Sequence, residues 1–141
     1  MLVYKISKTI YVNERNGTVS GLYGGRWNPK GINLLYTAGS TSLACLEYLV
    51  PNYHLMAGKS ITLSIIRLAD EVEIEEILIA DLPKDWQTKE FMPLSTQKIG
   101  LDFFRQSKSY MLKVPSAIVP NEYNYLLNPM HPDHGKTKIH Q

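Results

Sequence analysis

Proline interrupts the C-terminal part of the chain so often that no long helix can form there. Between residues 114 and 133, prolines stand at positions 115, 120, 129 and 132. Proline lacks the backbone N–H of a helix or an inner strand, so it favours loops and edge strands. The run from Glu122 to Leu127 is β-like in composition. We therefore expect strands and loops in this part of the chain.

The clearest helix is predicted from about Thr41 to Val50. Ser40 or Thr41 can cap it, because a short hydroxyl side chain accepts a free N–H of the first turn, and Pro51 is expected to end it. Its predicted apolar side consists of Leu43, Leu46, Leu49 and Val50.

A second helix is predicted from Ser95 to Gln106. Ser95 is the expected cap, and Leu94 and Ile99 have the spacing of a hydrophobic staple. A loop from Pro83 to Gln87, anchored by Trp86, is expected to precede this helix.

Short apolar or β-branched runs predict the remaining elements as strands. These runs are 2–6, 34–38, 60–68 and 72–79. The predicted fold class is therefore α+β, dominated by strands, with two main helices.

Composition limits the functions that this chain can have. Its 141 residues predict a single domain, 1–141, and a net charge of +2 is too balanced for a protein that binds mainly to nucleic-acid phosphates. Cys45 is the only cysteine, so no internal disulfide can form, and a reducing cytoplasmic location is expected. We find no signal peptide and no apolar run long enough for a membrane span, so no membrane contact is expected.

The segment from Gly24 to Gly31 is the first candidate site. Its two leading glycines allow a ligand to approach the backbone, Arg26 offers a planar donor for phosphate or carboxylate, and Trp27 offers a flat apolar face. The alternative is a tight turn with a surface arginine. The segment has neither the three-glycine spacing of a dinucleotide fold nor the Gly-Lys-Ser/Thr of a phosphate loop.

Three further side chains are candidates. Glu47 falls at the edge of the first helix's apolar side, where a half-buried carboxylate can stabilise positive charge. Ser116 lacks the surroundings of a nucleophile and is better suited to hydrogen bonding. Tyr36 is expected in the core with a hydroxyl partner, or stacked on a flat ligand ring.

The C-terminal His131, Asp133 and His134 have metal-ligand chemistry. The neighbouring prolines break any regular helical spacing, and no cysteine can join them. We expect a hydrogen-bonded turn there and no metal site.

Five blocks in this order resemble the RES domain family, which is named for its Arg, Glu and Ser. They are 24–31 (GGRWNPKG), 35–38 (LYTA), 43–47 (LACLE), 114–120 (VPSAIVP) and 128–133 (NPMHPD). The resemblance extends from about residue 2 to the C-terminus. It implies an ADP-ribosyltransferase-like fold, with two helices around a central cleft and NAD⁺ as substrate rather than as a cofactor.

The resemblance also implies roles and partners. Arg26, Glu47 and Ser116 fall on the family's naming positions, and Tyr36 falls on the aromatic residue before the helix. Lys5 stands where the family often has an arginine, which implies a weaker phosphate contact. Members are bacterial toxins that deplete NAD⁺ or transfer its ADP-ribose to a protein. The implied partner is an antitoxin with a helix-turn-helix part, while a target protein and a homodimer are left open.

The expected mechanism is cleavage of the nicotinamide–ribose bond. Arg26 would grip the pyrophosphate, Tyr36 would pack on the nicotinamide, and Ser116 would hold a ribose or amide group. Glu47 would stabilise the positively charged sugar or orient the acceptor. The alternatives are a non-catalytic NAD⁺- or ADP-ribose-binding module, a nucleic-acid binder using Arg26, Trp27 and Lys30, and an antitoxin-binding protein without activity.

Overall fold

The computed structural model describes residues 1–55 and 57–141. The described residues contain a seven-stranded sheet in the order β4-β5-β6-β2-β1-β3-β7. Its strands are β1 (Leu2–Lys8), β2 (Leu35–Ala38), β3 (Ile61–Arg67), β4 (Ile74–Glu76), β5 (Met111–Pro115), β6 (Tyr123–Leu127) and β7 (Lys138–His140). The α-helices are α1 (Thr18–Tyr23), α2 (Thr41–Asn52) and α3 (Leu94–Gln106). The short 3-10 turns are η1 (Thr9–Tyr11), η2 (Tyr53–Leu55), η3 (Ile79–Asp81) and η4 (Pro132–Lys136).

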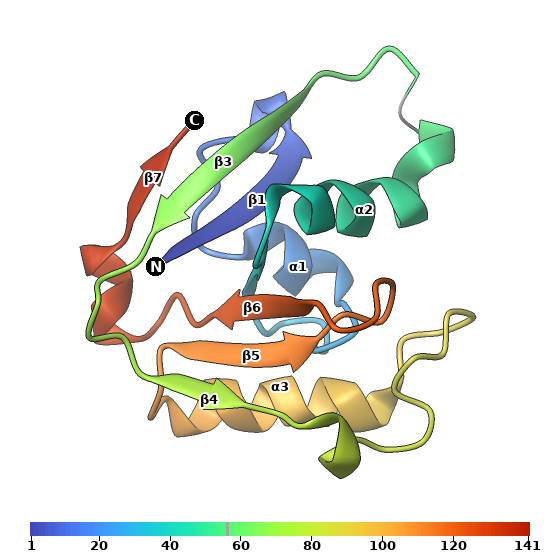
Figure 1. The fold of residues 1–141 in the computed structure, drawn as a ribbon, viewed down its shortest axis with the longest axis vertical. Coiled ribbons are helices and arrows are strands. Elements are labelled where there is room, and N and C mark those ends of the chain that lie inside the picture. Colours follow the sequence, from blue (N-terminus) through green and yellow to red (C-terminus); the bar gives the residue numbers. More distant parts are fainter. Residues whose placement is uncertain (56) are drawn as a thin grey trace.

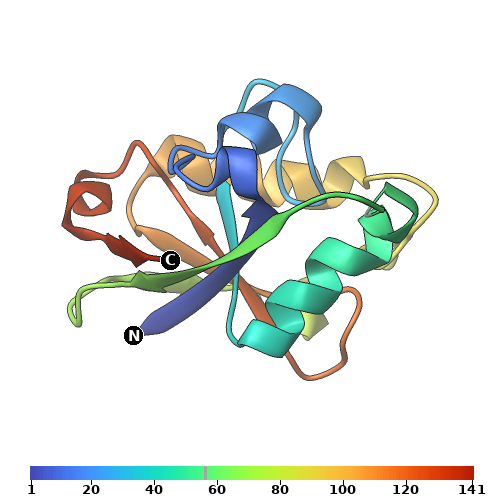
Figure 2. The same cartoon turned by 90° about the horizontal axis from the view of Figure 1, so that it is seen from above.

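The sheet has two parts that run in different directions (Figure 1). Strands β5 and β6 form one part with β4, while β1 and β3 form the other with β7. The pairing of β1 with β2 is short, with Tyr4 opposite Ala38. Helix α3 lies along the β4–β5 part, whereas α2 lies against β1 and β2, as both views show (Figures 1 and 2). Helix α2 therefore lies at the place where the sheet changes direction, and α3 covers the part that contains β5 and β6.

Three apolar clusters hold these layers together. One lies between the two parts of the sheet, around Val3, Ile66 and Leu127. The second joins α3 to the sheet through Phe103. The third, around Ala38, Leu43 and Ala44, joins α2 to the sheet. The α+β, strand-dominated class predicted from the sequence is confirmed.

Helix α2 is capped as predicted, because the Ser40 hydroxyl accepts the Leu43 N–H at 3.1 Å. Two other expectations about it are wrong. Pro51 lies inside the helix, which continues to Asn52, and the Asn52 side chain donates to the Tyr48 carbonyl at 2.7 Å. Pro51 has no N–H for the carbonyl four residues earlier, so the last turn of the helix lacks one backbone bond.

The predicted apolar side of α2 is also partly wrong. Leu46 is 43% exposed and Val50 is 46% exposed, whereas Leu43 and Ala44 are buried. The face of the helix that points toward the sheet therefore carries Leu43, Ala44 and, one turn later, Glu47.

Helix α3 begins differently from the prediction. Its N-cap is Pro93, with no capping side chain, and the Ser95 hydroxyl donates instead to the Asp85 carboxylate at 2.9 Å. Leu94 is 82% exposed, so it does not form the predicted staple. The burial of Trp86, which anchors the preceding loop, is confirmed.

The strands predicted near the N-terminus, at 34–38, at 60–68 and at 122–127 are confirmed as β1, β2, β3 and β6. The predicted strand 72–79 is shorter, because only Ile74–Glu76 pairs with β5. Helix α1 and strands β5 and β7 were not predicted. Strand β5 is an inner strand that ends at Pro115, a residue that favours an edge strand or a loop. In the described part of the chain, no helix combines the length and the apolar character that a membrane crossing requires.

Candidate active site

The glycine loop that follows α1 is built around Tyr36 of β2. Gly24 has a φ of +73°, which favours glycine. A Cβ on Gly25 would lie 2.6 Å from the Tyr36 hydroxyl oxygen, so this position also requires glycine. The Tyr36 hydroxyl donates to Asn28 Oδ1 at 2.6 Å and accepts the Trp27 N–H at 3.0 Å. Burial raises the pKa of Tyr36, which keeps this hydroxyl neutral and able to donate.

Trp27 belongs to the core and not to a ligand surface. Its side chain is 3% exposed and packs with Phe103 and Leu112. The expectation of a flat face open to a ligand is therefore wrong, and the nucleic-acid alternative loses one of its three residues.

Arg26 is held by the loop that precedes α3. Its Nη1 donates to the Trp86 carbonyl at 2.7 Å and to the Thr88 carbonyl at 2.9 Å. Burial lowers the pKa of Arg26, while the nearby Glu47 carboxylate and Tyr36 oppose that change. An arginine keeps its charge under such conditions. Its Nη2 and Nε have no acceptor among the described residues, so they can bind an anion.

Two residues of α3 fix the backbone on either side of this arginine. The buried Thr96 hydroxyl donates to the Arg26 carbonyl at 2.6 Å. The Gln97 side chain donates to the Gly25 carbonyl at 2.9 Å. The segment from Trp86 to Gln97 therefore holds the arginine by both its side chain and its main chain.

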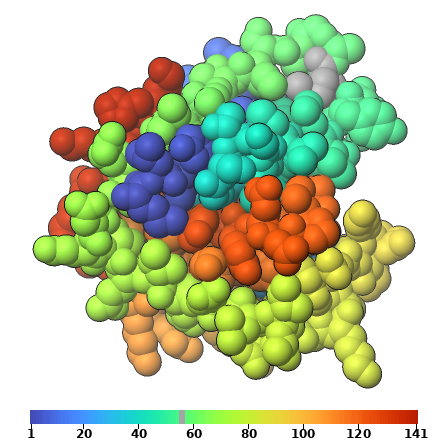
Figure 3. Space-filling model, in the orientation of Figure 1, coloured from blue at the N-terminus to red at the C-terminus, as the bar shows by residue number. Residues whose placement is uncertain are grey.

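Glu47 and Ser116 are brought into direct contact. The Ser116 hydroxyl donates to Glu47 Oε1 at 2.6 Å, and Asn124 Nδ2 donates to the same oxygen at 2.6 Å. Glu47 is half-buried, as predicted. No described residue donates to its second oxygen, Oε2. In the space-filling view, α2 (teal) and the segment after β5 (orange) adjoin on one face (Figure 3).

The Ser116 hydroxyl has no free bonding position. It accepts the Ile118 N–H at 3.1 Å and the Val119 N–H at 2.9 Å while it donates to Glu47. The residue is 3% exposed. This geometry suits a side chain that orients Glu47 rather than one that contacts a ligand.

A cavity of about 190 Å³ lies beside Glu47, on the sheet between β1 and β6. Its walls are mostly apolar, and three tyrosines contribute to them. It is lined by Tyr4, Lys5, Ile6, Tyr36, Thr37, Ala38, Ala44, Glu47, Tyr48 and Asn124. Sites for drug-sized ligands are typically about 300–1,000 Å³. This cavity therefore suits one ring system of a larger molecule.

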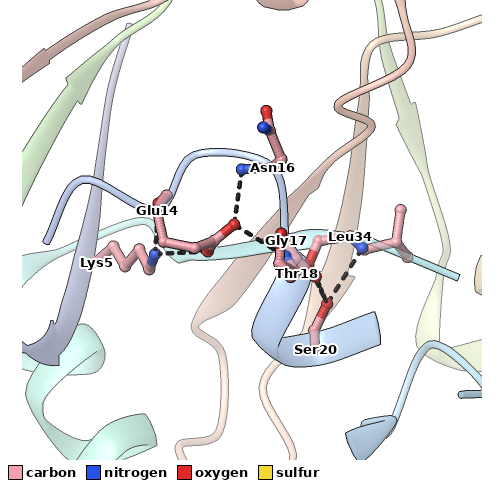
Figure 4. Close-up of polar contacts among 7 residues, drawn as sticks. All are labelled: Lys5, Glu14, Asn16, Gly17, Thr18, Ser20 and Leu34. Atoms are coloured by element: carbon pink, nitrogen blue, oxygen red, sulfur yellow. Dashed lines mark hydrogen bonds and ion pairs between the residues drawn. The ribbon is translucent and has the colours of Figure 1, made fainter. Parts of the chain in front are cut away.

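Lys5 lines this cavity, but its amino group is already engaged (Figure 4). Its Nζ donates to the Glu14 carbonyl at 3.1 Å and pairs with Glu14 Oε2 at 3.4 Å. Glu14 Oε1 in turn accepts the N–H groups of Asn16 and Thr18, at 2.8 and 2.9 Å. Lys5 thus joins β1 to the segment that leads into α1.

The C-terminal histidines lie in a hydrogen-bonded turn, as expected. His131 Nδ1 accepts the Asp133 N–H at 3.1 Å, and His134 Nδ1 is 2.8 Å from the hydroxyl of buried Tyr110. Asp133 pairs with Lys136 at 2.7 Å. Within 1–55 and 57–141, no three His, Cys, Asp or Glu side chains gather as a metal site would need.

Asn124 is the site residue that the sequence analysis missed. It lies two residues before buried Leu126 on β6, so both side chains point to the same face of the sheet. A polar residue at such a position is unusual unless it has a partner. That period-two pattern is the signal that could have identified it.

Comparison with known proteins identifies the family of this chain. The RES domain family model matches residues 2–141. A protein named Toxin Res from Photorhabdus laumondii subsp. laumondii is 40% identical over 140 residues, covering 96% of this chain and 86% of the relative. One named Prs ADP-ribosylating toxin from Sphingobium sp. is 33% identical over 135 residues, covering 90% and 80%.

A solved structure has the same fold. It is the crystal structure of the M. tuberculosis MbcT–MbcA toxin–antitoxin complex, one chain of which matches with a TM-score of 0.79 and 15% identity. The match covers 99% of this chain and 81% of that one. At this identity the likeness concerns the fold. The family match over nearly the whole sequence, together with relatives at 33–41% identity, shows that this chain belongs to the RES domain family.

Proposed function

We propose that this chain is the toxin of a toxin–antitoxin pair and that it cleaves the nicotinamide–ribose bond of NAD⁺. The proposal rests on the bonding and the location of the Glu47 carboxylate. One of its oxygens is fixed by Ser116 and Asn124, and the carboxylate lines a cavity within electrostatic range of Arg26.

The dinucleotide is held at two points. The free donors of Arg26 bind the pyrophosphate, for which a planar guanidinium is well suited. The nicotinamide end enters the tyrosine-lined cavity, whose volume fits one ring system, and Tyr36 forms part of its wall. Ser116 is a positioning residue in this scheme and does not bind the ribose.

Bond cleavage places positive charge on the ribose, as in glycoside hydrolysis. Nicotinamide leaves as a neutral molecule, so the site needs charge stabilisation more than acid catalysis. Glu47 Oε2, which has no donor among the described residues, provides the negative charge. The bond broken joins C1′ of the ribose to the pyridine nitrogen, and the electron pair leaves with nicotinamide.

The acceptor decides the product. Water as acceptor gives ADP-ribose, whereas a nucleophilic protein side chain gives an ADP-ribosylated target. The name of the Sphingobium relative supports transfer to a protein. The partner of the solved neighbour supports an antitoxin as a binding partner, and a helix-turn-helix protein remains our expectation for it.

Nicotinamide release from NAD⁺ by the purified protein, with and without cell extract, tests this function. The wild type should release nicotinamide, and Glu47→Gln should do so at least about 100-fold more slowly, because it removes the negative charge that the site supplies. Release that depends on extract indicates a protein acceptor. Equal release by both folded proteins would contradict the role of Glu47. Tight NAD⁺ binding without any release would favour the non-catalytic alternative.

A further inference from the structure

Asn124 has no role in the Arg–Glu–Ser pattern, yet it makes one of the two bonds that fix Glu47. We propose that Asn124 is a positioning residue. From its place on the sheet it binds Glu47 Oε1, so that Oε2 is the oxygen that faces the substrate. The proposal rests on the function proposed above and assigns this residue a part in it.

The backbone of Asn124 is firmly placed. It lies on β6 between β5 and β2, opposite Val114 on one side and Ala38 on the other. Its side chain is half-buried and lines the same cavity as Glu47. The inner strand fixes the position of the Asn124 Cβ, and the 2.6 Å bond to Glu47 Oε1 fixes the amide.

The two donors to Glu47 come from different elements. Ser116 follows β5, whereas Asn124 belongs to β6, and both bonds to Oε1 are 2.6 Å long. Two donors on one oxygen set the rotation of the carboxylate, while Glu47 itself is fixed on α2. Asn124 therefore acts through Glu47, by setting the orientation of its carboxylate.

Other ionisable groups surround this carboxylate. Arg26 reaches it electrostatically from the glycine loop. Lys5 and Tyr4 on β1, Tyr36 on β2 and Tyr48 on α2 line the same cavity. They are unchanged in variants at position 124, so a difference in titration between such variants reports the Asn124 contact.

The test compares wild type, Asn124→Ala and Asn124→Asp, with Asn13→Asp as a control on the exposed N-terminal loop. We measure kcat and KM for nicotinamide release against pH, and the titration of Glu47 by its carboxyl ¹³C shift. Circular dichroism and thermal unfolding verify that each variant folds. Asn124→Asp is nearly isosteric with the wild type. It therefore serves as the test variant if Asn124→Ala does not fold.

Asn124→Ala should lower kcat by about 10- to 100-fold and leave KM within about threefold, because a hydrogen bond to a charged group contributes about 1.5–3 kcal/mol. Asn124→Asp places a second carboxyl against Oε1. Because two carboxyls in contact disfavour each other's ionisation, the acidic limb of the pH–rate profile and the carboxyl ¹³C titration curve should move to higher pH. The control should change neither.

Two outcomes overturn the proposal. A raised KM with an unchanged Glu47 titration would make Asn124 a substrate ligand, and unchanged kinetics and titration would make its contact with Glu47 inconsequential. The ¹³C titration also separates this proposal from the function itself. A wild type that releases no nicotinamide contradicts the function, while the position-124 shifts still decide whether Asn124 controls Glu47.

Discussion

Glu14 and Glu47 are both half-buried carboxylates bound by several donors, but they differ in how many oxygens are occupied. In Glu14 both are used: Oε1 accepts two backbone N–H groups, and Oε2 pairs with Lys5. In Glu47 two side chains share Oε1, and Oε2 has no donor among the described residues. A fully bonded carboxylate stabilises the fold, whereas a half-bonded one beside a cavity remains available to a ligand.

The surroundings explain the difference. Glu14 lies in the turn before α1, where free backbone N–H groups point toward it. Glu47 lies inside α2, where the backbone N–H groups are already used, so only side chains from β6 and the segment after β5 can reach it. A carboxylate inside a helix is therefore positioned by side chains from other elements and not by free backbone N–H groups.

The largest expected effect is that glutamine at position 47 lowers turnover, whereas glutamine at position 14 lowers stability. Glu47→Gln should lose about 100- to 1,000-fold in turnover with little loss of stability, because its oxygen still accepts from Ser116 and Asn124 and its amide takes the position of Oε2. Glu14→Gln should lose about 1–2 kcal/mol of stability, since it weakens bonds to a charged acceptor, and retain turnover within about threefold. Thermal unfolding and nicotinamide release on both variants measure the result. Loss of activity in well-folded Glu14→Gln would contradict a purely structural Glu14.

The acid stability of the protein should reflect Glu14. Burial acts to raise the pKa of Glu14, but the Thr18 N–H, Lys5 and the Asn16 N–H outweigh it, so the pKa lies below its ordinary value of 4.5. A lowered folded-state pKa gives stability that is complete above 4.5 and is lost as the pH falls through the folded value.

Urea unfolding across a pH series measures this effect. The stability difference between wild type and Glu14→Gln should be constant near neutral pH and shrink below pH 4.5. If the stability difference stayed constant below pH 4.5, the ionisation of Glu14 would not be linked to folding.

The sequence predicted much of this architecture because several signals are local. The Ser40 cap, the short apolar strands and the burial of Trp86 depend on neighbouring residues. The errors on α2 and α3 have another origin. Leu46, Val50 and Leu94 are apolar, yet the tertiary packing leaves them exposed. Periodicity identifies an apolar stripe, but the neighbouring sheet decides which part of it is buried.

The site was predicted unevenly for a similar reason. Arg26, Tyr36, Glu47 and Ser116 are parts of short blocks that can be compared with a family. Their actual contacts join residues far apart in the chain, such as Arg26 with Trp86 and Glu47 with Asn124. The segment from 60 to 109 offered no usable motif, yet it holds Arg26 from both sides.

The smallest expected effect concerns Lys5, which the family pattern implied as a phosphate ligand. Its ion pair with Glu14 makes it part of the structural carboxylate's surroundings, although it also lines the cavity. Lys5→Met keeps the length of the side chain and removes the charge. It should cost about 1–2 kcal/mol of stability, because it removes a charged donor from a mostly buried carboxylate, and leave the KM for NAD⁺ within about threefold, with exposed Lys59→Met as the control. A KM rise of about tenfold corresponds to about 1.4 kcal/mol of lost binding. Such a rise would mean that Lys5 leaves Glu14 to bind the pyrophosphate, and the structural and functional carboxylates would then be coupled through this lysine.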